Sequence, residues 1–324
     1  MMLQSARNAL VAGVAGLLFI AGANAAEYPE RVVRLAVEFP AGGATDSMAR
    51  RIASKLSERL GQQFVVENRA GAGGIIAHEY VAKAAPDGYT LLLPSTAITI
   101  NASLHKKLSY DAQESFVPIS LLADWGALLV LHPSIPANTL PEFVRLVKAN
   151  PGKLSYSSAG TGTWPHLAME MLNGRSGMKI LHVPYKGAVP ALQDTIAGFV
   201  AAKIDSYITS MPQMKAGKLK AIGVTTAARM PQAPNVPTIA EQGYPGFDTA
   251  IWLGLVAPKG TPRDVVAKLE QNVMAIMKEK DLAQRLHDDG YNVRGTNAAE
   301  LAALMKKEIP QWRQVSREVG ITPN

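Results

Sequence analysis

Short apolar stretches alternate with amphipathic stretches along this chain, and no other sequence feature constrains the fold as strongly. Alternating side chains predict a strand over 32–39. A helix is predicted next, because apolar residues recur every four positions from Met48 to Leu60 before Gly61 stops the pattern. The set continues with a strand over 64–67, a helix over 75–85 and a strand over 89–94. This β-α-β-α-β order predicts a parallel sheet.

A second set of elements follows a long β-rich stretch over 116–132, which is long enough to pass from one lobe to another. We predict helices over 140–149, 163–172 and 189–197, and strands over 154–157, 180–183, 203–207 and 219–225. The remainder is a proline-rich irregular loop over 231–245, a strand over 252–257, and helices from 261, near 281–288 and over 298–318.

These two sets predict two α/β lobes with a cleft between them. A chain of 324 residues, 48% of them hydrophobic, is long enough for two domains with cores of their own. We place the first lobe at 26–124 and 226–324 and the second at 125–225. Clefts at the carboxyl ends of parallel strands are the usual ligand sites of open α/β sheets.

The first 25 residues have the pattern of a secretory signal peptide. Arg7 supplies a positive charge, an uncharged apolar run extends from Ala9 to Gly22, and Ala23-Asn24-Ala25 fits the rule of small residues before a cleavage site. The alternative is an uncleaved membrane anchor, although the run is short for a membrane span. Cleavage after Ala25 would leave a mature protein in the bacterial periplasm.

Composition excludes several classes of function. The absence of cysteine excludes disulfides, thiolate catalysis and cysteine-bound metals. The formal net charge of +7 comes without a run of five lysines or arginines, so we expect no nucleic-acid partner. The charge either steers small anions or serves solubility alone. The six histidines lack H-x-H and H-x-x-x-H spacings, so we expect no metal site.

The turn FPAGGATDSMAR (39–50), between the first strand and the first helix, is the first candidate binding element. Gly42 and Gly43 permit positive φ and close backbone approach. Thr45 is predicted as N-cap of a helix whose free N–H groups can bind an anion, although an ordinary turn is the alternative. Asp46 has three open orientations: away from the ligand, toward loop N–H groups, or toward a ligand ammonium group.

A second turn with the same plan, SYSSAGTGTWPH (155–166), lies in the second half. It leads from a strand through glycine and hydroxyl residues into a helix and contains no carboxylate. Two such turns facing each other would suit a ligand with a carboxylate at one or both ends. HVPYKG (182–187) is a third candidate. We expect His166, at a helix start, to serve hydrogen bonding or packing rather than as a general base.

No catalytic pattern is visible in the sequence. The stretch RAGAGGII (69–76) resembles a dinucleotide-binding fingerprint, but Ile76 stands at its third glycine position and no acidic residue ends a strand about 20 residues later. Neither a P-loop nor a G-x-S-x-G nucleophile elbow occurs. We therefore expect no cofactor and no enzyme activity, and an exported two-lobed protein of this kind is best explained as a ligand carrier.

Several longer runs, in order along nearly all of the chain after residue 25, point to a known family. They are FPAGGATDSMARRIA, VVENRAGAGG, KAAPDGYTLL, LSYDAQESFVPIS, NPGKLSYSSAGTGTWPHLAME, HVPYKGAVPALQD, KAGKLKAIGVTT, NVPTIAEQGYPGF, WLGLVAPKGTP and EIPQWRQV. In these runs the chain resembles the Bug family of extracytoplasmic solute receptors, the binding proteins of tripartite tricarboxylate transporters. The resemblance implies a two-lobed α/β periplasmic binding protein (type II, Venus flytrap) that holds a carboxylated small molecule in its cleft.

The resemblance also implies a set of ligand-binding residues. The matching positions are Phe39, Ala41, Gly42, Gly43, Thr45, Asp46, Ser95, Thr96, Ser158, Gly160, Thr161, Gly162, His166, Tyr185 and Asp205. Trp164, within the second turn, either stacks on an aromatic acid or packs beneath the loop. In place of the family's usual G-q-v-D run, this chain has Gly198-Phe199-Val200-Ala201, which puts a shared contact at Ala201 in question.

From the sequence we predict a monomeric periplasmic receptor that closes on a small carboxylate, with dicarboxylates favoured. Its partners would be transmembrane subunits of a tripartite tricarboxylate transporter or a sensor protein. One rival function is a periplasmic enzyme that uses His166 with Ser158 or Thr161. Another is a sensory or scaffold module with a vestigial cleft. Amino-acid, aliphatic, citrate-like and aromatic acids all remain open as ligands.

Overall fold

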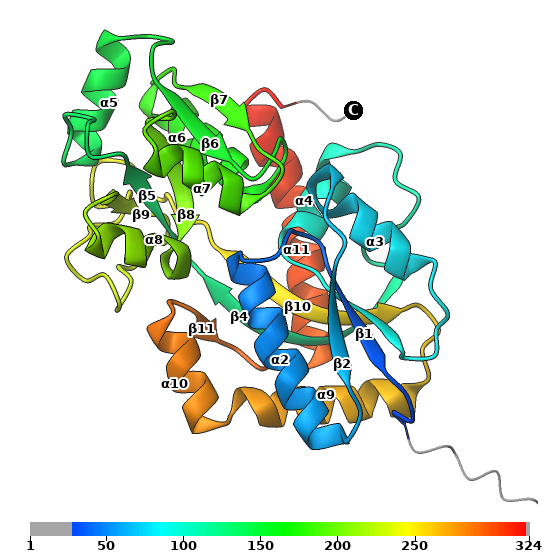
Figure 1. Cartoon of the computed structure of the whole chain (residues 1–324). Helices are drawn as coiled ribbons and strands as arrows, with labels where there is room; N and C mark the ends of the chain where they lie inside the picture. The colour runs from blue at the N-terminus through cyan, green and yellow to red at the C-terminus, as the bar shows by residue number, and fades with distance from the viewer. Residues whose placement is uncertain (1–27, 322–324) are drawn as a thin grey trace, which may run out of the picture.

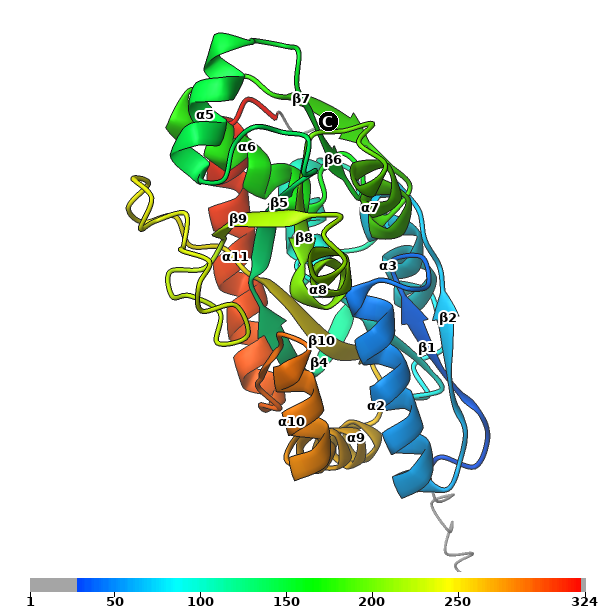
Figure 2. The ribbon, with the colours of Figure 1, turned by 60° about the vertical axis from the view of Figure 1, so that its left-hand side comes forward.

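The computed structural model describes residues 28–321, and the predicted signal peptide with its cleavage site lies outside that range. Two separate sheets divide these residues into two lobes, as Figures 1 and 2 show. Strands and helices occur in both lobes, which confirms the predicted two-lobed α/β fold. None of the helices in residues 28–321 has the length and apolar character of a membrane span.

The first lobe contains a six-stranded sheet. Its strands are β1 (Val33–Val37), β2 (Phe64–Asn68), β3 (Thr90–Leu93), β4 (Phe116–Trp125), β10 (Ile251–Pro258) and β11 (Asn292–Val293), in the order β11-β4-β10-β3-β1-β2. The pairs of β1 with β2 and β3 are parallel as predicted, whereas β10 runs antiparallel to β3 and β4. The sheet is mixed because β4 leads the chain out to the second lobe and β10 leads it back.

Helices cover both faces of this sheet. One face carries α2 (Ala44–Leu60), α9 (Arg263–Met277) and α10 (Lys280–Asp288), and the other carries α3 (Ile75–Ala82), α4 (Ala97–Leu104) and part of α11 (Ala298–Glu318). The predicted apolar face of α2 is confirmed, since Met48, Ile52 and Leu56 are completely buried. Burial of each such side chain contributes about 1.5–3 kcal/mol, which fixes α2 and the turn before it on the sheet.

The second lobe contains a five-stranded sheet and four helices. Its strands are β5 (Ala127–Leu131), β6 (Ser155–Ser158), β7 (Leu181–Pro184), β8 (Ala202–Ser206) and β9 (Lys220–Val224), in the order β7-β6-β8-β5-β9. Its helices are α5 (Leu140–Ala149), α6 (Trp164–Ser176), α7 (Ala188–Ile196) and α8 (Tyr207–Lys215). Because β6 is parallel to β7 and β8, the turns that open α6, α7 and α8 meet at one edge.

The lobes are connected three times. Gly126 alone separates β4 from β5, so the β-rich stretch passes between the lobes as predicted. The return segment packs on the second lobe, where Ile239 and Phe247 are fully buried in the core. The lobe boundaries after residues 124 and 225 stay predictions, and this packing favours a second boundary near residue 250. Finally, α11 runs along both lobes (Figure 2).

The sequence pattern does not predict two of the helices. α4 is buried at seven of its eight positions, so it shows no amphipathic period. α8 contains Pro212, which is unfavourable inside a helix. The helix expected from Thr261 begins at Arg263, with Pro262 as its N-cap. The other predicted elements are present, with differences of a few residues at their ends.

Candidate functional site

A cavity of about 80 Å³ lies between the two lobes. The first lobe contributes the turn between β1 and α2 and the residues at the start of α4. The second lobe contributes the turns that open α6 and α7 and the end of β8. Trp125, Ala127 and Ile251, from the strands that cross between the lobes, complete the walls. The cleft expected between the lobes is therefore present.

Glycines allow the loops of the two lobes to approach closely. A Cβ atom on Gly187, in the second lobe, would lie 2.8 Å from Cγ of Pro40 in the first. A Cβ atom on Gly162 would lie 3.1 Å from Cδ1 of Leu104. Larger residues at these positions would push the lobes apart. In this structure the loops of the two lobes are thus in close contact across the cleft.

The turn that opens α2 differs in one detail from the prediction. Gly43, in an extended conformation, is the N-cap, and Thr45 lies inside the first helical turn, so the prediction of Thr45 as N-cap is wrong. The turn is closed by the Gly42 N–H, which donates to Asp46 Oδ2 at 3.0 Å. Gly42 has φ +90°, a conformation that favours glycine.

Asp46 is turned toward the loop and its neighbours. Besides Gly42, Arg50 Nε donates to Oδ2 at 2.9 Å and Asn68 Nδ2 donates to Oδ1 at 2.9 Å. Burial raises the pKa of Asp46, but the hydrogen bonds from Arg50, Gly42 and Asn68 outweigh burial and lower the pKa below its ordinary value. Of the three orientations considered, the structure has the second, in which the carboxylate holds loop N–H groups.

The turn that opens α6 is closed in the same way by a different side chain. Gly162, with φ +77°, donates its N–H to Nδ1 of His166 at 3.0 Å. Thr163 is the N-cap, and Pro165 follows within the first turn. Since Nδ1 accepts a hydrogen bond, the proton of the neutral ring lies on Nε2. His166 therefore has the hydrogen-bonding role expected from the sequence.

A second histidine packs on the first. The rings of His166 and His182 are stacked, with 3.9 Å between centroids, and His182 Nε2 lies 2.6 Å from the hydroxyl oxygen of Ser158. Burial lowers the pKa of His166 to about 4. Burial and the neighbouring His166 lower the pKa of His182 to about 4, although Glu170 acts in the opposite direction. Both rings are neutral at pH 7, so the second turn carries no histidine charge.

Both helix starts leave backbone N–H groups without partners. Among residues 28–321, no acceptor bonds the N–H of Ala44, Thr45 and Asp46 in α2. The same holds for the N–H of Trp164 and His166 in α6. Residues 43–46 and 163–165 line the cavity. Free N–H groups at a helix start attract anions, which makes the starts of α2 and α6 candidate anion-binding positions, one in each lobe.

Predicted hydroxyl ligands are already engaged in the protein. Ser95 donates its backbone N–H to Oε1 of Glu38 at 2.9 Å, and its hydroxyl bonds the same oxygen. The other carboxylate oxygen of Glu38 lies 2.5 Å from Nε2 of His78. Thr96 Oγ1 accepts the Trp252 N–H at 3.0 Å. These hydroxyls hold the loops in shape, and the buried Glu38 is a residue that the sequence analysis did not identify.

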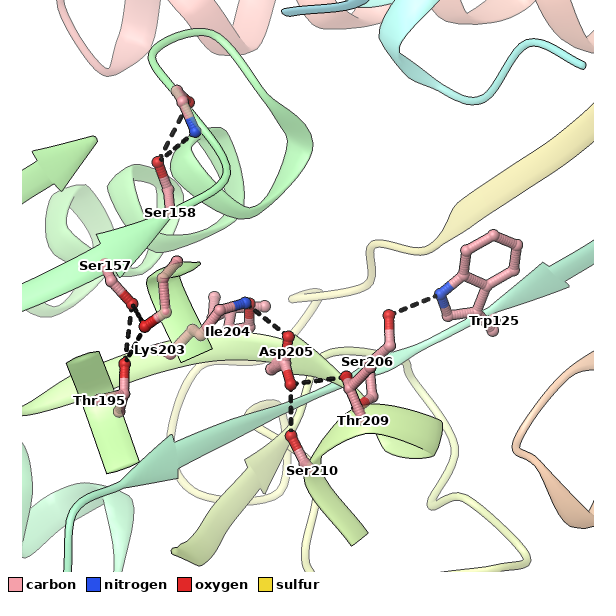
Figure 3. Close-up of polar contacts among 12 residues, drawn as sticks. Trp125, Ser157, Ser158, Thr195, Lys203, Ile204, Asp205, Ser206, Thr209 and Ser210 are labelled. Atoms are coloured by element: carbon pink, nitrogen blue, oxygen red, sulfur yellow. Dashed lines mark hydrogen bonds and ion pairs between the residues drawn. The ribbon is translucent and has the colours of Figure 1, made fainter. Parts of the chain in front are cut away.

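Figure 3 shows a buried ion pair at the end of β8. Lys203 Nζ lies 2.5 Å from Oδ1 of Asp205, and the two side chains are 1% and 3% exposed. Thr209 and Ser210, at the start of α8, donate to Oδ2 of Asp205 at 2.7 and 2.8 Å. Lys203 and Asp205 both line the cavity. The sequence analysis missed Lys203, although a lysine two positions from Asp205 in a strand lies on the same face.

Seven of the predicted residues line the cavity: Phe39, Gly43, Thr45, Asp46, Ser95, Trp164 and Asp205. The other nine do not line it: Ala41, Gly42, Thr96, Ser158, Gly160, Thr161, Gly162, His166 and Tyr185. Several of these nine shape the loops instead, as Gly42, Ser158 and His166 do. Their direct contact with a ligand stays a prediction. Thr161 is exposed on the surface.

Trp164 and Tyr185 have partners of their own. Trp164 is 4% exposed, packs in the core of the second lobe and donates Nε1–H to Oγ1 of Thr249 at 2.9 Å. It thus packs beneath the loop while one side lines the cavity. The hydroxyl of Tyr185 donates to Oδ2 of Asp194 at 2.6 Å. Within residues 28–321 no group of three or more His, Asp or Glu side chains could hold a metal ion.

The chain has two α/β lobes with a cavity between them, and helix starts lie in the walls of that cavity. This is the architecture of a solute-binding protein. Residues 48–321 match the family described as "Tripartite tricarboxylate transporter family receptor". The chain belongs to this receptor family. The match agrees with the resemblance to Bug proteins, which one of the solved structures below also supports.

Three solved structures are similar over most of the chain. The periplasmic binding protein BugD is 38% identical, covers 91% of this chain and 99% of its own, and has a TM-score of 0.87. R. palustris Rpa4515, solved with adipate, is 36% identical, covers 92% and 100%, and has a TM-score of 0.89. MatC from Rhodopseudomonas palustris, with bound malate, is 36% identical, covers 89% and 99%, and has a TM-score of 0.84.

Proposed function

We propose that this protein is a periplasmic receptor that binds a small dicarboxylate between its lobes. One observation carries the proposal: the first turns of α2 and α6, one from each lobe, line a single cavity with unpartnered N–H groups. A carboxylate at a partly buried helix start gains up to about 2 kcal/mol from the helix dipole. The ligands named for Rpa4515 and MatC, adipate and malate, are both dicarboxylates.

The cavity favours a short ligand with an apolar middle. Its volume of about 80 Å³ has room for on the order of six water-sized groups, since each needs roughly 10–15 Å³. Phe39, Trp125 and Val189 supply apolar surface between the polar positions. A short aliphatic diacid has such an apolar middle and a carboxylate at either end. Citrate-like and aromatic acids are larger, and we rank them below aliphatic diacids as candidate ligands.

The family supports a location and partners for the protein. The receptor family serves tripartite tricarboxylate transporters, so we infer that the closed, loaded receptor delivers its ligand to the transmembrane subunits of such a transporter. A sensor protein is the second candidate partner. Export through the predicted signal peptide, with cleavage after Ala25, would bring the monomeric receptor to the periplasm.

Binding can be tested with a thermal-shift panel of mono-, di- and tricarboxylates, followed by calorimetric titration of the best ligands. A ligand at 100 times its dissociation constant stabilises the protein by about 2.7 kcal/mol, so the cognate acid raises the melting temperature by several degrees. A panel in which no carboxylate shifts the melting temperature would contradict the proposal and favour a scaffold module.

Two matched variants connect binding to the cavity. A Cβ atom on Gly43 meets no other atom within 4 Å, so Gly43→Val fits the fold and fills cavity space. Gly174→Val is the control, because Gly174 has equally open surroundings in α6 and does not line the cavity. We expect Gly43→Val to weaken ligand binding at least tenfold and Gly174→Val to leave it unchanged. Recovery of the acid unchanged after long incubation with the protein would exclude the rival enzyme.

A further inference from the structure

Lys203 is a buried cation in a cavity wall. It lies on β8, is 1% exposed and lines the cavity between the lobes. The other ionisable residues in the walls are Asp46 and Asp205, so Lys203 is the one cationic side chain among the described residues that line the cavity. Arg50, the partner of Asp46, has a side chain 54% exposed and does not line it.

The hydrogen bonds around Lys203 leave donor capacity. An ammonium group has three N–H donors. One is directed to Oδ1 of Asp205 at 2.5 Å, and a longer contact of 3.4 Å joins Nζ to the carbonyl of Ile204. Asp205 is in turn held by Thr209 and Ser210 through its other oxygen. The ammonium group is therefore fixed in position by Asp205 and retains one N–H for a further acceptor.

We propose that Lys203 forms a subsite for one carboxylate of the ligand and makes the receptor selective for diacids over monoacids. The proposal rests on the proposed function. One carboxylate lies at the free N–H groups of α2, and the second, at the start of α6, also accepts a hydrogen bond from Lys203. Hydrogen bonds between ionised groups are about twice as strong as neutral ones, and burial protects this one from screening by salt. Asp205 positions Lys203 and does not contact the ligand carboxylate.

The competing explanation is that Lys203 only neutralises Asp205. In that case removal of both charges together would leave binding unchanged, since well-packed neutral residues often replace a buried ion pair without loss of stability. The double variant Lys203→Met/Asp205→Asn separates the two explanations, because it removes the cation without leaving Asp205 as a buried unpaired charge. Lys203→Gln/Asp205→Asn is a second double variant without either charge, in case the first fails to fold.

The test compares the affinities for succinate and adipate with those for butanoate and hexanoate, by calorimetry. Lys220→Met is the control: Lys220 lies on β9 of the same sheet, bonds to the carbonyl of Ile135 at 2.7 Å and does not line the cavity. We expect both double variants to lose about 10- to 100-fold in diacid affinity, the range for a hydrogen bond to a charged group. In the same variants the affinity for monoacids should change less than threefold. Lys220→Met should leave the affinities for diacids and monoacids unchanged.

Three outcomes are distinguishable. Selective loss of diacid affinity supports the subsite. Unchanged diacid affinity, or an equal loss for monoacids and diacids, overturns it while the proposed function stands. If the wild-type protein binds neither these four acids nor any other carboxylate, both the proposed function and the subsite are overturned. Circular dichroism and thermal unfolding of each variant confirm that the compared proteins are folded.

Discussion

The turns that open α2 and α6 share one backbone design and differ in the side chain that completes it. In each turn a glycine with positive φ donates its N–H to the side chain four residues later. In the first turn the acceptor is the carboxylate of Asp46, and in the second it is the neutral ring of His166. The first acceptor carries a negative charge and the second carries none.

The difference shows two ways to complete such a turn without leaving an uncompensated negative charge beside the free N–H groups. Asp46 is compensated by Arg50 and Asn68, which donate to its two oxygens. His166 needs no compensating charge, because burial keeps its ring neutral at pH 7. A carboxylate next to an anion site is thus acceptable when its lone pairs are already taken up by the protein. Backbone N–H groups stay free in both turns, at positions 44–46 in the first and at Trp164 and His166 in the second.

The largest expected difference between the turns is their response to acid. The pKa of His166 is about 4 in the folded protein and 6.5 in ordinary surroundings, so the unfolded chain binds the proton first. The stability due to the neutral ring is complete above pH 6.5 and is lost as the pH falls toward 4. Against His166→Asn, which keeps an acceptor for Gly162, we expect wild type to lose on the order of 2–3 kcal/mol between pH 7.5 and 4.

Urea unfolding of both proteins across this range measures the loss. The first turn should behave differently, because the pKa of Asp46 is lowered and its contribution persists until the pH falls below the ordinary carboxyl range. An Asp46→Asn variant should therefore keep a constant stability difference from wild type between pH 7.5 and 5. An acid-sensitive difference for Asp46→Asn in that window would contradict the comparison.

The next effect concerns the loss of the acceptor in the first turn. Asp46→Ala leaves the Gly42 N–H and one N–H of the Asn68 amide without a partner, and we expect a loss of about 2 kcal/mol in the free energy of unfolding. Asp46→Asn retains one acceptor oxygen and should lose about half as much. Chemical unfolding at pH 7.5 measures both values. Equal losses for the two variants would show that charge, rather than hydrogen bonding, maintains the turn.

A smaller effect is expected for the two glycines. Gly42→Ala and Gly162→Ala each place a side chain at positive φ, which costs about 1–2 kcal/mol. Their effects on ligand affinity should differ, because the new Cβ lies 3.1 Å from Leu104 of the other lobe at position 162 but 3.4 Å from Val189 at position 42. We expect the larger loss of affinity for Gly162→Ala in a calorimetric titration. The reverse order would contradict the close contact of the loops across the cleft.

The smallest effect belongs to Arg50, which has no counterpart in the second turn. In its ion pair with Asp46, the Arg50 side chain is 54% exposed, and pairs with a solvent-exposed partner contribute about 0.2–1 kcal/mol. Arg50→Met should lower the stability by that amount at low ionic strength and by less in 1 M salt. Salt titration of the melting temperatures of both proteins tests this expectation. A loss that persists at high salt would assign Arg50 a packing role.

The strength of the sequence prediction depended on periodicity. α2 and the two parallel β-α-β units follow from regular apolar spacing, and both helix-opening turns follow from the change of period at a glycine. α4 does not, because a helix buried at almost every position loses its amphipathic pattern. α8 does not, because Pro212 and its hydroxyl neighbours resemble a loop. In both cases tertiary packing overrides the local signal.

For the candidate site, the sequence indicates the turns but not the direction of each side chain. Asp46 is turned by Asn68 and Arg50, of which Asn68 lies on another strand. Ser95 is occupied by Glu38, 57 residues away in the chain. The sequence does not indicate Lys203 as a site residue, because a lysine in a strand is usually solvated. Pairing of distant residues decides all three, and a single sequence does not display such pairing.

The last helix couples the two lobes mechanically. Leu301 and Met305 of α11 pack in the first lobe, and Trp312 packs in the core of the second. Pro310 lies between these two segments, where the missing N–H removes one rung of the helix ladder. A rotation of the lobes must therefore strain or bend α11 near this proline. We therefore expect the bending stiffness of α11 to add to the free-energy cost of any such rotation.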